Sequence, residues 1–171
     1  MVGFLKKDKE KITMKLVNLF TELANPLNWK EYVSGDIYYP PNSLGYSRIQ
    51  MPQVEDKYQR KFFQYLHDFG IKFSKKTFRV GEIKPSQKEI RIDVSMELLK
   101  TQSNKLKKPI LISSDGYVID GHHRWFAFFL ENPIQKIKFI KISIPAKKII
   151  PLINKFDFVS GEDIKSKPKK Y

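Results

Sequence analysis

Apolar and polar residues change their spacing several times along the chain, and each change marks an expected element. Apolar side chains at helical spacing predict amphipathic helices over residues 9–24 and 54–69, the second of them stopped by Gly70. Residues 25–55 between them contain repeated prolines and glycines and indicate an irregular stretch. Nearly alternating apolar residues over 71–84 then predict a strand or a hairpin.

The second half of the chain predicts shorter elements in mixed order. Pro85 indicates a turn into a short helical segment, and Asp93 is expected to cap a helix over 94–101. Isoleucine-rich alternation over 137–144 predicts a strand, and Pro145 is expected to begin a further helix. No internal repeat interrupts this order.

The most informative stretch places a polar cluster where a strand gives way to a helix. Pro109-Ile110-Leu111-Ile112 predicts a buried strand, Asp115-Gly116 a tight turn, and Tyr117-Val118-Ile119 a second strand. From Gly121 the apolar residues follow helical spacing until Asn132-Pro133. The residues expected at this strand-to-helix junction are Asp120, Gly121, His122, His123 and Arg124.

The chemistry of this junction suits a phosphate-bearing ligand. The first turn of a helix has unpaired N–H groups, and Gly121 would let a ligand approach the backbone closely. Arg124 can offer a planar set of donors to phosphate oxygens. Asp120 would repel phosphate, so we expect it to hold Mg²⁺ or to orient a histidine. Each residue taken singly also fits an ordinary role, such as a helix cap or a surface cation, and it is their combination that favours function.

The irregular stretch is dense in aromatic rings, namely Trp29, Tyr32, Tyr38, Tyr39 and Tyr46. Such a loop either stacks on a base or covers the edge of the core, and the second role is the commoner one. Arg48 and Gln53 are polar residues that the loop could bring toward a ligand, although nothing in the sequence requires it.

Charge is the strongest feature of the composition. The formal net charge is +14 and favours a polyanionic partner, which would be a nucleotide, DNA or RNA. The competing interpretation is that a lysine-rich chain is simply soluble. The residues expected to contact nucleic acid are Lys107 and Lys108 in a basic linker, with Lys165, Lys167, Lys169 and Lys170 in a basic tail.

Other classes of protein are disfavoured by composition. The chain has no cysteine, which excludes disulfides, thiolate metal sites and a cysteine nucleophile. No apolar run is long enough to cross a membrane, and the first residues lack the order of a signal peptide. We therefore expect a cytoplasmic protein with no membrane partner, and no oligomeric state follows from the sequence.

The segment Asp120-Gly121-His122-His123-Arg124-Trp125 resembles the signature of the ParB/sulfiredoxin superfamily, in which a Gly-x-x-Arg-type motif opens a helix and binds nucleotide phosphates. The Asp-Gly-His-His-Arg form is most similar to the branch that contains nucleotide-dependent free-serine kinases. Sulfiredoxin itself carries a cysteine in the motif, so its chemistry is excluded here. The resemblance covers roughly residues 78–145.

The resemblance implies an α+β fold, with a small mixed sheet flanked by helices and an extra N-terminal helical region. The expected regions are 1–77, helical with an aromatic loop; 78–156, the ParB/sulfiredoxin-like core; and 157–171, the basic tail. In the serine-kinase branch a glutamate before the motif is the catalytic base, and Glu89 matches that position best. On its own spacing, Glu89 is equally a solvated carboxylate on a turn.

These observations together predict a nucleotide-binding protein that catalyses Mg²⁺-dependent phosphoryl transfer or nucleotide hydrolysis. ATP, ADP or CTP is the expected nucleotide. Glu89, Asp120, His122 and His123 are the expected catalytic residues. Residues 121–124 (Gly121, His122, His123 and Arg124) are expected to bind phosphate, and Asp120 is the expected metal ligand. The alternatives are a DNA-binding ParB-like protein or nuclease without kinase activity, and an accessory protein that binds nucleotide and catalyses nothing.

Overall fold

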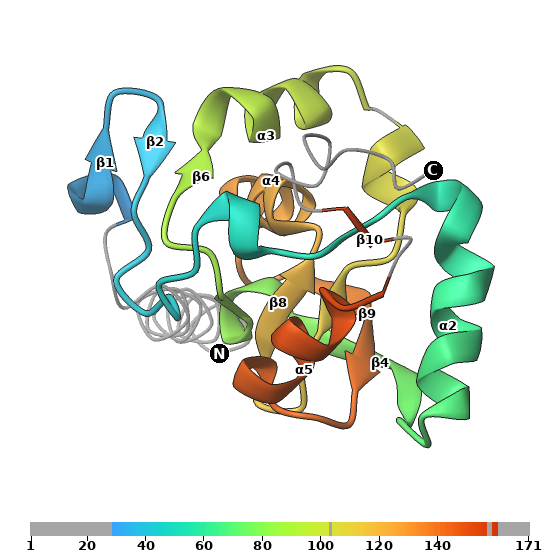
Figure 1. Ribbon diagram of the computed structural model, residues 1–171. Coiled ribbons are helices and arrows are strands. Elements are labelled where there is room, and N and C mark those ends of the chain that lie inside the picture. Colours follow the sequence, from blue (N-terminus) through green and yellow to red (C-terminus); the bar gives the residue numbers. More distant parts are fainter. Residues whose placement is uncertain (1–28, 103, 157–158, 161–171) are drawn as a thin grey trace, which may run out of the picture.

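The computed structural model describes residues 29–102, 104–156 and 159–160, so the helix expected over 9–24 and the tail lysines lie outside the described residues. Helices and strands are mixed along the chain, as expected for the α+β class (Figure 1). With η marking a 3₁₀ turn, the elements are η1 (Trp29–Tyr32), β1 (Val33–Ser34), β2 (Ile37–Tyr38), η2 (Arg48–Gln50), β3 (Gln53–Val54), η3 (Asp56–Tyr58), α2 (Gln59–Asp68), β4 (Phe73–Arg79), η4 (Val80–Glu82), β5 (Lys84–Pro85), β6 (Ile90–Arg91), α3 (Ile92–Lys100), η5 (Asn104–Lys107), β7 (Leu111–Ile112), β8 (Tyr117–Asp120), α4 (His122–Glu131), β9 (Lys136–Ile142), α5 (Ala146–Ile153) and β10 (Val159–Ser160).

The main sheet has five strands in the order β4-β9-β7-β8-β5. It is mixed, because β4 with β9 and β7 with β8 are antiparallel, whereas β7 with β9 and β5 with β8 are parallel. The predicted hairpin around Asp115-Gly116 is confirmed and joins β7 to β8. The Asp115 carboxylate accepts a hydrogen bond of 2.9 Å from the Ala146 N–H, which caps the start of α5.

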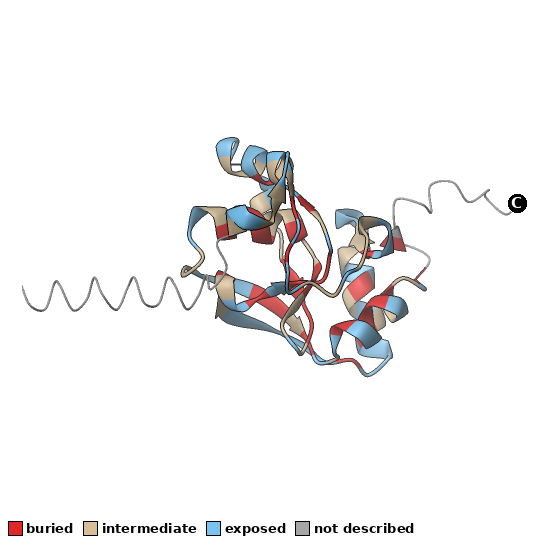
Figure 2. Ribbon diagram, turned by 90° about the vertical axis from the view of Figure 1, so that its left-hand side faces the viewer, coloured by how far each residue is buried: buried red, intermediate tan, exposed pale blue. Residues whose placement is uncertain are grey.

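Neighbouring residues of the central strands enter two different hydrophobic clusters, because side chains alternate across a sheet. Ile119 and Ile140 join the cluster under α2 and α5, whereas Val118 and Phe139 join the cluster under α4. Helices therefore cover both faces of the sheet, and the buried residues gather between them (Figure 2). None of the helices in the described ranges combines the length and apolar character needed to cross a bilayer.

The helix expected over 54–69 forms mainly as α2, preceded by the 3₁₀ turn η3, and Gly70 follows its end as predicted. Of the aromatic residues before it, Tyr38 belongs to the core: its ring stacks on Phe126 with centroids 4.7 Å apart and planes at 8°. Trp29 meets Phe126 edge-on at 5.9 Å. These two rings therefore cover the core.

The turn into a helix expected at Pro85 is wrong. Lys84 and Pro85 form the short strand β5, which pairs in parallel with β8. Proline is tolerated there because β5 is the last strand of the sheet, where a missing N–H breaks no inner ladder. Asp93 also lies inside the first turn of α3, bonded to Arg91, where a cap was expected.

The expected boundary between residues 77 and 78 falls inside β4, which runs without interruption from Phe73 to Arg79. Met51 and Phe62, from the segment before that boundary, share one buried cluster with Leu111 and Ile140. In the described structure the aromatic segment thus contributes to the same core as the strands of the central motif.

Candidate functional site

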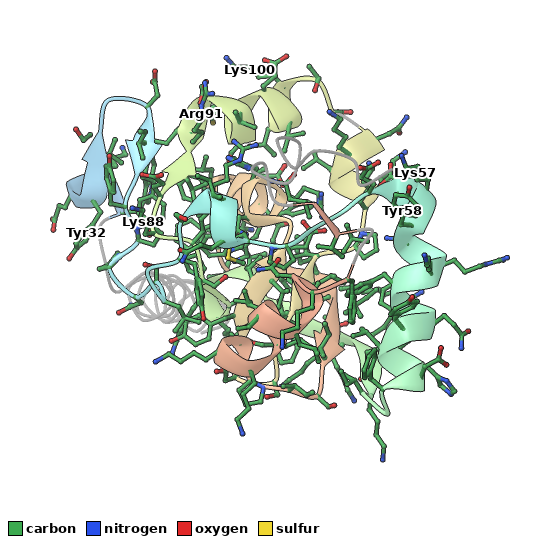
Figure 3. All side chains as sticks on the ribbon, in the orientation of Figure 1. Tyr32, Lys57, Tyr58, Lys88, Arg91 and Lys100 are labelled. Carbon is green, nitrogen blue, oxygen red and sulfur yellow. The ribbon has the colours of Figure 1, made fainter. Side chains whose placement is uncertain are left out.

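A cleft of about 660 Å³ opens where β8 passes into α4. Its residues come from four parts of the chain: the segment from η2 to the start of α2, the stretch after β5, α3 with the turn that follows it, and the β8–α4 junction. Figure 3 labels Lys57, which lines the cleft just before α2, and its neighbour Tyr58, together with Arg91 of β6, which directly precedes α3. The polar residues that line the cleft are Arg48, Gln53, Glu55, Asp56, Lys57, Gln59, Gln87, Lys105, Lys108, Asp120, His122, His123 and Arg124.

The floor of the cleft depends on close packing between Gly121 and Arg124. Gly121 has φ +97°, and a Cβ at this position would lie 2.7 Å from Arg124 Nη2. The guanidinium therefore occupies the space that a side chain would need. Arg124 Nη2 also donates a hydrogen bond of 3.0 Å to the carbonyl oxygen of Pro109. The same guanidinium has a buried Nε with no hydrogen-bond partner among the described residues.

His122 is held by a serine that lies far away in the sequence. Its Nε2 lies 3.0 Å from the hydroxyl oxygen of Ser86, and that hydroxyl donates to the carbonyl oxygen of Val118. The serine proton is thus committed to Val118, so His122 Nε2–H donates to Ser86 and Nδ1 is left as an acceptor. Burial, followed by the charges of His123 and Arg124, lowers the pKa of His122 to about 3. His122 is therefore neutral at pH 7.

The pKa of His123 indicates a positive electrostatic potential at this end of the cleft. Burial, followed by repulsion from Arg48 and Arg91, lowers the pKa of His123 to about 4. Its Nε2 is buried and has no hydrogen-bond partner in the described part of the chain. The surroundings of this ring thus combine positive potential with an unsatisfied nitrogen, which is the environment that an anion would fill.

Asp120 carries the carboxylate of the cleft floor, with Oδ2 lying 3.6 Å from Arg124 Nη2. Burial raises the pKa of Asp120, although Arg124 acts in the opposite direction. Within the described ranges no group of three or more His, Asp or Glu side chains could hold a metal ion. A single carboxylate, that of Asp120, could be the one protein ligand of a Mg²⁺ ion, because Mg²⁺ beside nucleotides commonly takes its other oxygen ligands from phosphate and water.

The structure brings together the junction residues Asp120 to Arg124, as expected, and adds Arg48 and Gln53 from the aromatic loop. Glu89 is partly buried and is not one of the residues that line the cleft. Lys108 lies at the cleft but is paired with Asp56, and Lys107 is exposed in η5.

Gln87 is a cleft residue that the sequence did not indicate. It is only 3% exposed, yet it lines the cleft. A backbone bridge to Tyr46 fixes its position. The sequence places Gln87 two residues after Pro85, where we expected a helical turn and therefore a surface residue.

Comparison with known proteins gives one distant likeness. No model of a known protein family matches the chain, and none of the curated proteins does. A solved structure of a Pnob8-like ParB-N domain is similar over 48% of this chain and 35% of its own chain, with 13% identity and a TM-score of 0.34. A likeness at this level assigns neither function nor site residues, so the functional case rests on the cleft.

The buried histidine predicts a pH-dependent stability. Because the pKa of His122 is lowered to about 3, the unfolded chain binds more protons than the folded chain below about pH 6.5. Above that pH the buried neutral imidazole of His122 costs no stability. Below it, the free energy of unfolding falls with acidification by about 1.4 kcal/mol per pH unit. We expect His122→Gln to make urea-derived unfolding free energies less dependent on pH between 6.5 and 4.5.

The matched control is His67→Gln, because the side chain of His67 is 80% exposed on α2. It should leave the pH dependence as in the unmodified protein. The raised pKa of Asp120 changes stability with pH in the opposite direction. Asp120 is present in the unmodified protein and in both variants, so its effect cancels in the comparison. Equal slopes for His122→Gln and the unmodified protein would contradict the assignment of His122 as a buried, neutral imidazole.

Proposed function

We propose that the cleft binds a nucleotide, with its phosphates at the start of α4. The observation that carries this proposal is the pair of buried nitrogens without partners, His123 Nε2 and Arg124 Nε, in the first turn of that helix. A buried polar group without a partner costs about 1–3 kcal/mol. Phosphate oxygens would satisfy both nitrogens and would also meet the unpaired N–H groups of the helix start.

The rest of the cleft supports a nucleotide over inorganic phosphate. A volume of about 660 Å³ is in the range of small-molecule sites and exceeds what a single phosphate needs. Val54, Val94 and Leu98 line the cleft, are only partly buried, and supply apolar surface for a sugar or a base. The amide of Gln87, which lines the cleft, offers both a donor and an acceptor, which suits the polar edge of a base.

The proposal extends to transfer or hydrolysis of the terminal phosphoryl group. An acceptor hydroxyl or water would attack the terminal phosphorus, the bond to the bridging oxygen would break, and the nucleotide would leave one phosphate shorter, as a diphosphate from ATP or CTP and as a monophosphate from ADP. Asp120 would accept the acceptor's proton, because its carboxylate lies on the floor of the cleft beside Arg124 and burial raises its pKa. Arg124 would stabilise the phosphoryl charge. Mg²⁺ held with the phosphates would supply further charge stabilisation.

Two other sequence expectations have less support from the cleft. Glu89, the base implied by the resemblance, does not line it. A metal-dependent nuclease would need several metal ligands, and the described residues contain no group of three or more that could serve.

The phosphate role of Arg124 predicts a loss of affinity. We expect Arg124→Ala to weaken binding of ATP, ADP or CTP, measured by isothermal titration calorimetry, by about 10- to 150-fold. This is the equivalent of a charge-assisted hydrogen bond of about 1.5–3 kcal/mol. Arg60→Ala, on the exposed side of α2, is the matched control and should bind as the unmodified protein does. Unchanged affinity in a folded Arg124→Ala protein would contradict the proposal that Arg124 binds a nucleotide phosphate.

The base role of Asp120 predicts a separation of binding from turnover. Asp120→Asn keeps the shape of the side chain but cannot accept a proton at neutral pH. We expect nucleotide affinity within a few-fold of the original and a phosphate-release rate about 10²- to 10⁴-fold lower. Glu89→Gln tests the competing base and should retain turnover, with Asp68→Asn on α2 as the surface control. Abolished turnover in Glu89→Gln with normal turnover in Asp120→Asn would reverse the assignment.

The position of Gln87 at the cleft predicts different effects on stability and binding. Gln87→Leu removes the amide and keeps a side chain of similar size, so the free energy of unfolding should change little. Nucleotide affinity should fall several-fold, with unequal effects on ATP and CTP if the amide contacts the base. Gln64→Leu is the control, because that amide bonds Asp68 at 2.8 Å on the surface of α2. A destabilised Gln87→Leu protein with unchanged affinity would make the residue structural.

A further inference from the structure

The ladder between β4 and β9 has one face that is covered at one end only. Residues paired across the ladder share a face, so Lys75, Thr77 and Arg79 lie on the same side as Lys136 and Lys138. At the covered end, Phe73 packs on Phe63 of α2 with ring centroids 4.8 Å apart. At the open end Lys75, Thr77, Lys136 and Lys138 are all exposed.

The charge of this open face is not neutralised. Lys75, Lys136 and Lys138 make no ion pair with any residue that the structure describes. By contrast, Lys57 and Lys108 at the cleft are paired with Glu55 and Asp56. The acidic contact on this part of β4 is Glu82, 3.9 Å from Arg79. The face therefore carries a surplus of positive charge.

The ordinary explanations account for this arrangement only in part. Lysines where a strand lacks a neighbour on one side prevent pairing with other chains. This explains Lys75 on β4, and it also applies to Lys136 and Lys138, because β7 pairs with β9 at Ile140 and Lys141 and does not extend along the earlier part of β9. Stability does not explain the cluster, since Arg79 stands directly opposite Lys136 and like charges at such positions destabilise a sheet.

We infer that this face, formed by Lys75, Lys136 and Lys138, binds the phosphate backbone of a nucleic acid. Alternate residues of a strand are about 6.6–6.8 Å apart and neighbouring strands about 4.8 Å, so the ammonium groups form a compact array. Each nucleic-acid strand offers a charge about every 3.4 Å along the helix axis, so several phosphates can meet the array at once. None of the three lysines lines the cleft, so this site is additional to the proposed nucleotide site.

The test compares two triple variants that remove the same charge. Lys75→Gln, Lys136→Gln and Lys138→Gln are combined in one protein, and Lys30→Gln, Lys88→Gln and Lys100→Gln in the control. The control lysines are exposed, and Figure 3 shows Lys88 and Lys100 well away from β4. Binding of a fluorescent DNA duplex is followed by anisotropy at several salt concentrations. We expect the first variant alone to bind more weakly, with a log–log salt slope shallower by about 0.9 for each phosphate that is no longer neutralised.

Several results would overturn the inference. They are no duplex binding by the unmodified protein at the lowest salt, equal weakening in both triple variants, or equal lysine-dependent binding to anionic lipid vesicles. Single-stranded DNA and RNA of the same length show which form is preferred, and selective weakening in the first variant supports the site for either form. Nucleotide affinity should stay unchanged in both variants, so a failure of the cleft proposal is seen separately.

Discussion

The contact between the Arg124 guanidinium and the backbone of Gly121 is the constraint on which the cleft depends. Position 121 requires a glycine for two reasons. Its backbone has φ +97°, and a Cβ there would lie 2.7 Å from Arg124 Nη2. The same guanidinium reaches back to the carbonyl of Pro109, just before β7. One backbone conformation therefore sets the start of α4, the position of the cation and the connection to the neighbouring strand.

Burial divides the polar groups of the cleft into fixed charges and neutral rings. The guanidinium groups supply the fixed charge, as arginine side chains do in proteins, while His122 and His123 are kept neutral by desolvation and by nearby positive charge. Recognition of an anion would thus rely on groups that do not titrate near neutral pH. His123 would contribute a hydrogen bond through its unpaired Nε2, whereas Ser86 sets the tautomer of His122.

The parts predicted correctly from the sequence are those with local signals. The hairpin around Asp115-Gly116 and the helix from His122 follow from turn residues and a change of apolar period within a few residues. The parts that were missed depend on pairing between distant segments. β5 has two residues and exists because β8 lies beside it, and Gln87 reaches the cleft through a bridge to Tyr46. Arg48 was noticed as polar, but its place beside His123 follows from packing.

The pairing of β3 with β10 has a consequence for biosynthesis. Gln53 of β3 lines the cleft, and its strand is held by Ser160 and Val159, while Asn154 bonds the carbonyl of Gln50 at 2.7 Å. A nascent chain that has emerged only through α4 already contains the residues of the cleft floor but lacks the strand that holds β3. Closing such a long loop is among the slow steps of folding. The edge of the cleft formed by β3 is therefore completed only after the chain has been synthesised through β10.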